Sequence, residues 1–79
     1  MLVKVKLFAT LRKYLPGATL GTAVDFEVQE GSSLLDLFAL LNIPAEEVKL
    51  TYVNGIYCDP ETILNNADEV GIFPPVGGG

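Results

Sequence analysis

The sequence ends in three consecutive glycines, residues 77–79, which follow Pro74, Pro75 and Val76. Glycines pack no side chain, and holding each one in a fixed conformation costs on the order of 1–2 kcal/mol. A glycine run does let a backbone approach groups of another protein closely, because no Cβ is in the way. If a terminal carboxylate has to thread a narrow channel in another protein, Gly79 would carry the reacting carboxylate and Gly78 would give steric access to it. The alternative is an ordinary frayed terminus.

The rest of the composition excludes most independent chemistry. The chain has no histidine, so it cannot hold a Ser-His or Cys-His pair or an H-E-x-x-H zinc site. Its single cysteine, Cys58, cannot form an internal disulfide or a thiolate metal cage and is expected to be a small packing residue. We expect no bound metal or cofactor and no enzyme activity of the chain by itself.

The charge balance bears on partners and location. Ten acidic and five basic residues give a net charge of −5, which repels nucleic-acid and anionic membrane surfaces. Such a protein is expected to dock on a basic protein surface, unless the acids serve only solubility. The alternating N-terminus is not a signal peptide, and the longest apolar run, residues 37–41, is too short to span a bilayer. We expect a cytoplasmic protein.

Two strands show the same alternation and the same exception. Residues 3–7 alternate strictly and predict a strand with its apolar side chains inward, which places the next residue, Phe8, on the outward face. Residues 69–73 predict the last strand, and there the alternation turns Phe73 outward. Two outward aromatic side chains on strands that flank the chain ends are unexpected for a surface that only meets water.

Further strands are predicted at residues 22–28, 50–53 and 56–58. The last two flank Asn54-Gly55, which indicates a type I′ hairpin because both turn residues need positive φ. The two-residue loop fixes the cross-strand pairs: Val53 with Ile56, Tyr52 with Tyr57, and Thr51 with Cys58. Which face of this hairpin is buried stays open at this point.

One helix is predicted over residues 33–41. Ser33 and Asp36 have the spacing of a capping box. The expected buried stripe follows helical spacing and consists of Leu34, Leu37, Phe38 and Leu41, widened by Leu35 and Leu40. Pro44 is expected to end the helix. Residues 9–15 are expected to make a helical turn or two before Pro16-Gly17.

The predicted order is strand, strand, helix and three more strands. One helix packed across a mixed sheet of about five strands is an α+β fold with a single core. We expect residues 1–76 to form this domain and residues 77–79 a flexible tail.

Several segments resemble one family, in order along the chain. Residues 68–79 are similar to the D-E-V-x-x-F-P-P-V-x-G-G ending of MoaD, the molybdopterin synthase small subunit. Residues 3–12 resemble its opening strand and F-A-x-x-R motif, and residues 33–37 and 53–55 its helix start and hairpin. The related thiamine-pathway carrier, ThiS, usually lacks the F-A-x-x-R and Phe-Pro-Pro motifs. The chain departs from the pattern at Gly77 and at the turn over residues 66–68.

The resemblance implies a β-grasp (ubiquitin-like) fold and a sulfur carrier. A MoeB/ThiF-like enzyme would use ATP to adenylate Gly79, a persulfide donor would supply sulfur to form a thiocarboxylate, and a MoaE-like large subunit would pass it to the molybdenum or tungsten cofactor. The positions that match the family's partner interface are Phe8, Arg12, Phe73, Pro74, Pro75 and Val76.

Three other readings remain at the level of sequence. The acceptor could be the thiamine thiazole, or protein lysines as in ubiquitin-like tagging. The chain could also be a β-grasp interaction module without covalent chemistry. A small independent hydrolase is disfavoured by the missing histidine.

Overall fold

A computed structural model describes residues 1–14 and 23–75. Val76 and the predicted tail, with Gly78 and Gly79, lie outside the described residues. The elements are β1 Leu2–Leu7, η1 Ala9–Tyr14, β2 Val24–Glu27, α1 Leu34–Leu41, η2 Ala45–Glu47, β3 Leu50–Val53, β4 Ile56–Tyr57 and β5 Glu69–Phe73, where η marks a 3-10 helix. The predicted order of strands and helix is confirmed, and with it the α+β class.

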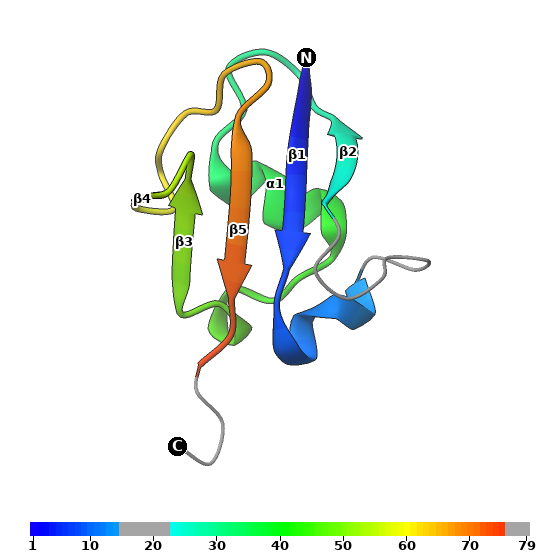
Figure 1. Cartoon of the computed structure of the whole chain (residues 1–79), viewed down its shortest axis with the longest axis vertical. Coiled ribbons are helices and arrows are strands. Elements are labelled where there is room, and N and C mark those ends of the chain that lie inside the picture. The colour runs from blue at the N-terminus through cyan, green and yellow to red at the C-terminus, as the bar shows by residue number, and fades with distance from the viewer. Residues whose placement is uncertain (15–22, 76–79) are drawn as a thin grey trace.

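The first and last strands form the centre of the sheet. The five strands lie in the order β2-β1-β5-β3-β4, and only the β1–β5 pair is parallel. Leu7 lies opposite Ile72, so both strands end at the same edge of the molecule (Figure 1). We call this edge the Phe73 end and the opposite edge the Met1 end. The pairing places the N-terminal strand beside the residues that lead to the C-terminus.

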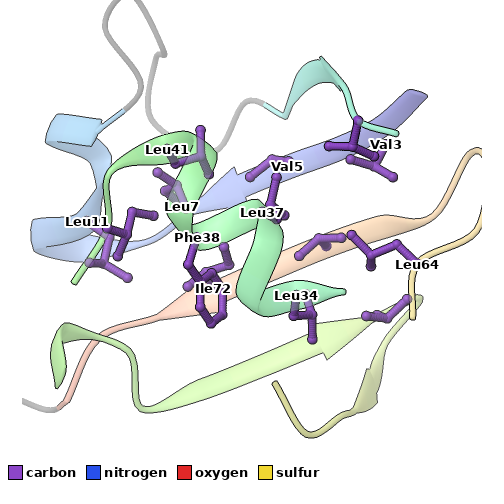
Figure 2. Packing of buried hydrophobic residues seen from close by; sticks show 14 residues of the cluster. Val3, Val5, Leu7, Leu11, Leu34, Leu37, Phe38, Leu41, Leu64 and Ile72 are labelled. Atoms are coloured by element: carbon purple, nitrogen blue, oxygen red, sulfur yellow. The ribbon is translucent and has the colours of Figure 1, made fainter. Parts of the chain in front are cut away.

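The core lies between this sheet and α1, which crosses one face of it (Figure 1). Val3, Val5 and Ile72 are fully buried from the sheet side. Figure 2 shows side chains of α1 and of the central strands meeting in this layer. Burial of each large apolar side chain contributes roughly 1.5–3 kcal/mol. The inward positions predicted for β1 and β5 are therefore confirmed.

The buried stripe of α1 is narrower than predicted. Leu34, Leu37, Phe38 and Leu41 are buried, but the exposed fractions of Leu35 and Leu40 are 44% and 52%. The prediction that these two leucines join the stripe is wrong, because the sheet covers the helix from one side only and leaves their positions uncovered. Within the described residues, no helix is long and apolar enough to cross a membrane.

Both ends of α1 have clear physical causes. The Ser33 hydroxyl accepts from the Asp36 N–H, and the Asp36 carboxylate accepts from the Ser33 N–H, which confirms the predicted capping box. The helix ends at Leu41, as predicted, because Asn42 takes a left-handed conformation with φ 59°.

The hairpin forms as predicted, with φ 54° at Asn54 and 83° at Gly55. Its buried face, left open by the sequence, carries Thr51 and Val53, so Tyr52 faces outward. The Asn54 side chain also donates to the Asp68 carboxylate and accepts from the Glu69 N–H. These bonds fasten the hairpin to the start of β5.

Two other predicted segments reach residues outside the described ones, Thr22 in the first and Leu15 in the second. The strand predicted over residues 22–28 is β2, Val24–Glu27, and only Val28 just beyond it is fully inside the core. The helical turn predicted over residues 9–15 is the 3-10 helix η1, which sends Leu11 into the core.

The turn before β5 stores backbone strain at Ala67, an exposed residue with φ 71°. A left-handed conformation costs a residue with a Cβ roughly 1–2 kcal/mol, whereas glycine adopts it freely. Ala67→Gly should therefore raise the free energy of unfolding by about 0.5–1 kcal/mol after the larger entropy of the unfolded glycine is counted. Chemical denaturation of the two proteins measures this difference.

Ala39→Gly is the matched control. Ala39 is exposed within α1, where glycine costs about 1 kcal/mol relative to alanine. The same substitution should thus stabilise the chain at position 67 and destabilise it at position 39. A loss of stability at both positions would contradict the strain assigned to Ala67.

Candidate functional site

The outward face of the sheet carries a stacked aromatic pair. Phe8 follows β1 and Phe73 ends β5, and strand alternation turns both rings away from α1. Their ring centroids are 4.0 Å apart and the ring planes differ by 5°. Both side chains are half-buried, because each ring covers one face of the other and leaves the rest of it accessible. The sequence prediction that both aromatics lie outside the core is confirmed.

Two tyrosines extend this pair across the sheet. Tyr52 of β3 meets Phe73 edge-on at 5.7 Å between centroids, and Tyr57 of β4 meets Tyr52 edge-on at 6.0 Å. We call the four residues Phe8, Phe73, Tyr52 and Tyr57 the aromatic row. Edge-to-face and offset contacts add roughly 0.5–1.5 kcal/mol per pair beyond area burial. The row is thus a preformed apolar surface over four strands.

Gly71 forms the floor beneath the phenylalanines. A Cβ at this position would lie 3.4 Å from Phe8 and 3.7 Å from Phe73, so both rings already cover the glycine at contact distance. Beside them, an open cavity of about 430 Å³ is lined by Gly71, Tyr52, Lys4 and other residues of this face. A side chain larger than alanine at position 71 would push the rings outward, so the glycine sets how flat the aromatic row lies.

The F-A-x-x-R segment has a specific geometry. Ala9 has φ 52°, which turns the chain sharply out of β1, and the Leu11 N–H then donates to the Phe8 carbonyl. This turn buries Leu11 while leaving Phe8 outside. The Arg12 Nε donates to the Ala9 carbonyl, so the predicted interface residue Arg12 lies at the Phe73 end next to the aromatic row.

The end of β5 is held from both sides. The Phe8 N–H donates to the Ile72 carbonyl and the Lys49 N–H to the Phe73 carbonyl. Pro74 and Pro75 have no N–H and cannot continue the ladder, so the sheet ends here. Pro74 is half-buried and Pro75 exposed, whereas Val76, Gly78 and Gly79 fall outside the described residues. The structure therefore brings Phe8, Arg12, Phe73 and Pro74 to one end of the molecule.

A polar clamp joins the two 3-10 helices at this end. The Tyr14 hydroxyl donates to the Glu47 carboxylate at 3.0 Å. Loss of hydration, and after it this bond to Glu47, raise the pKa of Tyr14 above its ordinary value. In the described part of the chain, no group of three or more acidic or cysteine side chains is arranged to hold a metal ion. The clamp is a structural link between η1 and η2.

Sequence reasoning missed Tyr52, Tyr57 and Gly71 as parts of the site. The predicted hairpin pairing already placed the tyrosines opposite each other. The missing step was the buried face of β3, where a polar Thr51 takes an inward position by donating to the Cys58 carbonyl. Cys58 itself is half-buried and packs against the core, as predicted.

Several solved structures are similar to this fold. A putative molybdopterin converting factor subunit 1 from Pyrococcus furiosus is 31% identical, with a TM-score of 0.72 over 95% of this chain and 98% of that one. SAMP1 from Haloferax volcanii is 22% identical, with a TM-score of 0.72 over all of both chains. The Haloferax volcanii HVO 2177 protein is 26% identical, with a TM-score of 0.76 over 100% of this chain and 87% of that one.

These neighbours establish the fold as β-grasp and ubiquitin-like, as the sequence resemblance implied. Among curated proteins, no sequence matches the chain. The family model described as ThiS family matches residues 5–79, which is nearly the whole sequence and includes its last residue. Ubiquitin-like carriers and modifiers of this kind are not themselves catalytic. By this match, the chain belongs to the ThiS family.

Proposed function

We propose that the chain is a cytoplasmic sulfur carrier that serves as the small subunit of a molybdopterin synthase. The observation that carries this proposal is the aromatic pair Phe8–Phe73 at the point where Pro74-Pro75 lead toward the terminal glycines. An apolar surface there positions the chain on a partner while the C-terminus enters the partner's active site. The family match that extends through Gly79 supports the same reading.

The chemistry takes place on Gly79. A carboxylate oxygen attacks the α-phosphorus of ATP on an adenylating enzyme, pyrophosphate leaves, and the carboxyl carbon becomes the electrophile of an acyl-adenylate. The sulfur of a persulfide donor attacks this carbon and AMP leaves. A thiol then attacks the donor's sulfur in the sulfur–sulfur bond, so that a disulfide forms between this thiol and the donor while a thiocarboxylate is left on Gly79. Each step requires close approach to the last residues, which the absence of Cβ atoms permits.

The chain supplies the reacting atom and its partners supply the catalytic groups. A large subunit would take the thiocarboxylate and transfer its sulfur to a pterin precursor, forming the dithiolene that later holds molybdenum or tungsten. The metal would thus bind the product and not this chain. The sequence is consistent with this division, because it contains no histidine and a single cysteine.

Two features favour the pterin acceptor over its alternatives. The F-A-x-x-R and Phe-Pro-Pro motifs are present, and the Pyrococcus furiosus structure named as a molybdopterin converting factor is 31% identical. The same activated Gly79 could instead supply sulfur to a thiazole or acylate a lysine of another protein. Two assays separate the pterin from protein lysines. Incubation of the activated chain with a large synthase subunit and pterin precursor tests sulfur transfer to the pterin, and cell extract probed for covalent ladders tests attachment to lysines.

The first prediction concerns the terminal residue. Incubation with the cognate adenylating enzyme, ATP and a persulfide donor should raise the intact mass by the difference between one sulfur and one oxygen. A chain that lacks Gly78 and Gly79 should show no gain, because the electrophilic carbon would no longer reach the enzyme. One extra residue beyond Gly79 should also abolish the gain, because the electrophilic carbon would then lie in the wrong place.

Cys58→Ser is the control for sulfur bound elsewhere. Cys58 is a half-buried thiol and could take up sulfur as a persulfide. The Cys58→Ser chain should gain the same mass as the native chain. A gain that is lost in this variant, or that survives removal of the two glycines, would refute the mechanism.

The second prediction separates docking from folding. Phe73→Ala removes the aromatic at the centre of the row and should weaken binding to the large subunit by about 2–4 kcal/mol. The fold should lose only about 1 kcal/mol, because the ring stacks on Phe8 outside the core. Isothermal titration gives the affinity, and thermal melting of the isolated variant gives the stability.

Phe38→Ala provides the matched comparison. Phe38 has an exposed fraction of 3% within the core, so its truncation should cost roughly 3–5 kcal/mol of folding stability. Phe38→Ala should therefore lower the melting temperature more than Phe73→Ala does. Phe73→Ala should lower the affinity per folded molecule more than Phe38→Ala does. If Phe73→Ala melts like Phe38→Ala, or binds like the native chain, Phe73 is not a docking residue.

A further inference from the structure

Basic side chains gather at the Phe73 end of the molecule. Lys6 lies opposite Gly71 on the outward face, and its Nζ is 5.7 Å from the centre of the Phe8 ring. Arg12 and Lys13 lie in η1, the helix that follows Phe8. Lys49 donates its N–H to the Phe73 carbonyl. Four of the five basic residues of the chain thus lie in the segments that meet where β5 ends.

Three of these cations have no acidic partner. Lys13 lies 3.9 Å from the Glu47 carboxylate, and Lys4, farther along β1, lies 3.3 Å from Asp25. No other ion pair exists in residues 1–14 and 23–75, which contain every aspartate and glutamate of the sequence. Lys6, Arg12 and Lys49 therefore carry charges that no carboxylate side chain neutralises; Lys49 is exposed, and Lys6 and Arg12 are half-buried. Glu46 of η2 is the one acid at this end that is exposed and unpaired.

The Met1 end has the opposite character. Glu27 lies opposite Leu2, and Glu30 lines a surface hollow together with Met1. Both glutamates are exposed, and no lysine or arginine lies in this hollow. The net charge of −5 is therefore unevenly distributed, with unpaired positive charge where the chain leads to its C-terminus.

We propose that Lys6, Arg12 and Lys49 form a basic collar that docks on an acidic surface around the opening through which a partner protein admits the C-terminus. This inference rests on the proposed carrier function and names the chemistry of the partner's rim. Protein interfaces place apolar side chains at the centre and charged ones around them. The collar supplies the charged side chains beside the apolar aromatic row, so the part of the partner that contacts the collar must be acidic.

The collar and the net charge predict opposite signs for the partner. A net charge of −5 alone favours encounter with a basic surface, whereas the collar favours an acidic one. Charges interact over about 10 Å at 0.1 M salt, so the charges nearest the contact decide the association rate. Neutralising the collar lysines should therefore slow association if the partner's surface is acidic and speed it if that surface is basic.

Association with the adenylating enzyme, followed by stopped flow at 0.1 M salt, is the direct test. The collar variant Lys6→Gln/Lys49→Gln should associate about three- to tenfold more slowly than the native chain. The control Glu27→Gln/Glu30→Gln changes the opposite end and should associate at the native rate. The fourfold variant combines both changes, keeps the native net charge of −5, and should be as slow as the collar variant.

Two results would overturn the collar. If the collar variant associates faster and the glutamate variant more slowly, net charge governs encounter and the partner's rim is basic. If all variants associate at the native rate, the collar does not contact the partner. The mass gain of the native chain is measured in the same reactions, so a failure of the carrier function is seen separately from a failure of the collar.

A second measurement needs no partner. In a heteronuclear NMR titration, a short polyglutamate peptide should shift the backbone amides of Lys6, Arg12 and Lys49, and added salt should reverse the shifts. The collar variant should lose this response. If polyglutamate leaves these amides unmoved, the collar is refuted. Equal shifts with ATP alone would mean that the cations bind nucleotide phosphate, which would overturn the assignment to an acidic protein surface.

Discussion

The parallel pairing of β1 with β5 is the constraint on which the rest of the structure depends. It joins the two ends of the chain in the middle of the sheet, and the inward side chains of both strands form the layer that α1 covers (Figure 2). Parallel strands need a long crossover, so every other element lies in the connection between them. Since both strands end at the same edge, Phe8 is brought beside Phe73, which Pro74 and Pro75 follow directly.

Two small residues, Ala9 and Gly71, help to arrange the aromatic side chains on the outward face of the sheet. Ala9 turns the chain with φ 52° so that Leu11 enters the core while Phe8 stays outside. Gly71 leaves room for the phenylalanine rings to lie flat on the sheet. These positions add nothing to the chemistry directly. They fix the orientation of the aromatic row before a partner arrives, which limits the conformational entropy lost on binding.

A carrier of this kind separates its reacting atom from its recognition surface. In the proposed function, Gly79 carries the reacting carboxyl group, whereas the features proposed to recognise a partner lie in the folded domain. The aromatic row contributes burial of apolar area, and the basic collar contributes the sign of the charge around it. The unpaired state of the collar is informative because ten acids are present in the same small domain and only Asp25 and Glu47 approach a lysine.

The sequence by itself determined the elements whose causes are local. Alternation set the inward faces of β1 and β5, Ser33 and Asp36 set the helix start, and Asn54-Gly55 set the hairpin and its pairing. It also predicted Gly79 as the reacting residue, through the resemblance to sulfur carriers, and the ThiS family model matches residues 5–79.

The tertiary structure decided everything that requires knowing which segments become neighbours. The exposure of Leu35 and Leu40 depends on how much of α1 the sheet covers, and the outward face of Tyr52 depends on β3 joining β5 in a particular register. The gathering of cations at the Phe73 end depends on β1 lying beside β5. Local spacing carries no information on such contacts, because they join residues far apart in the sequence.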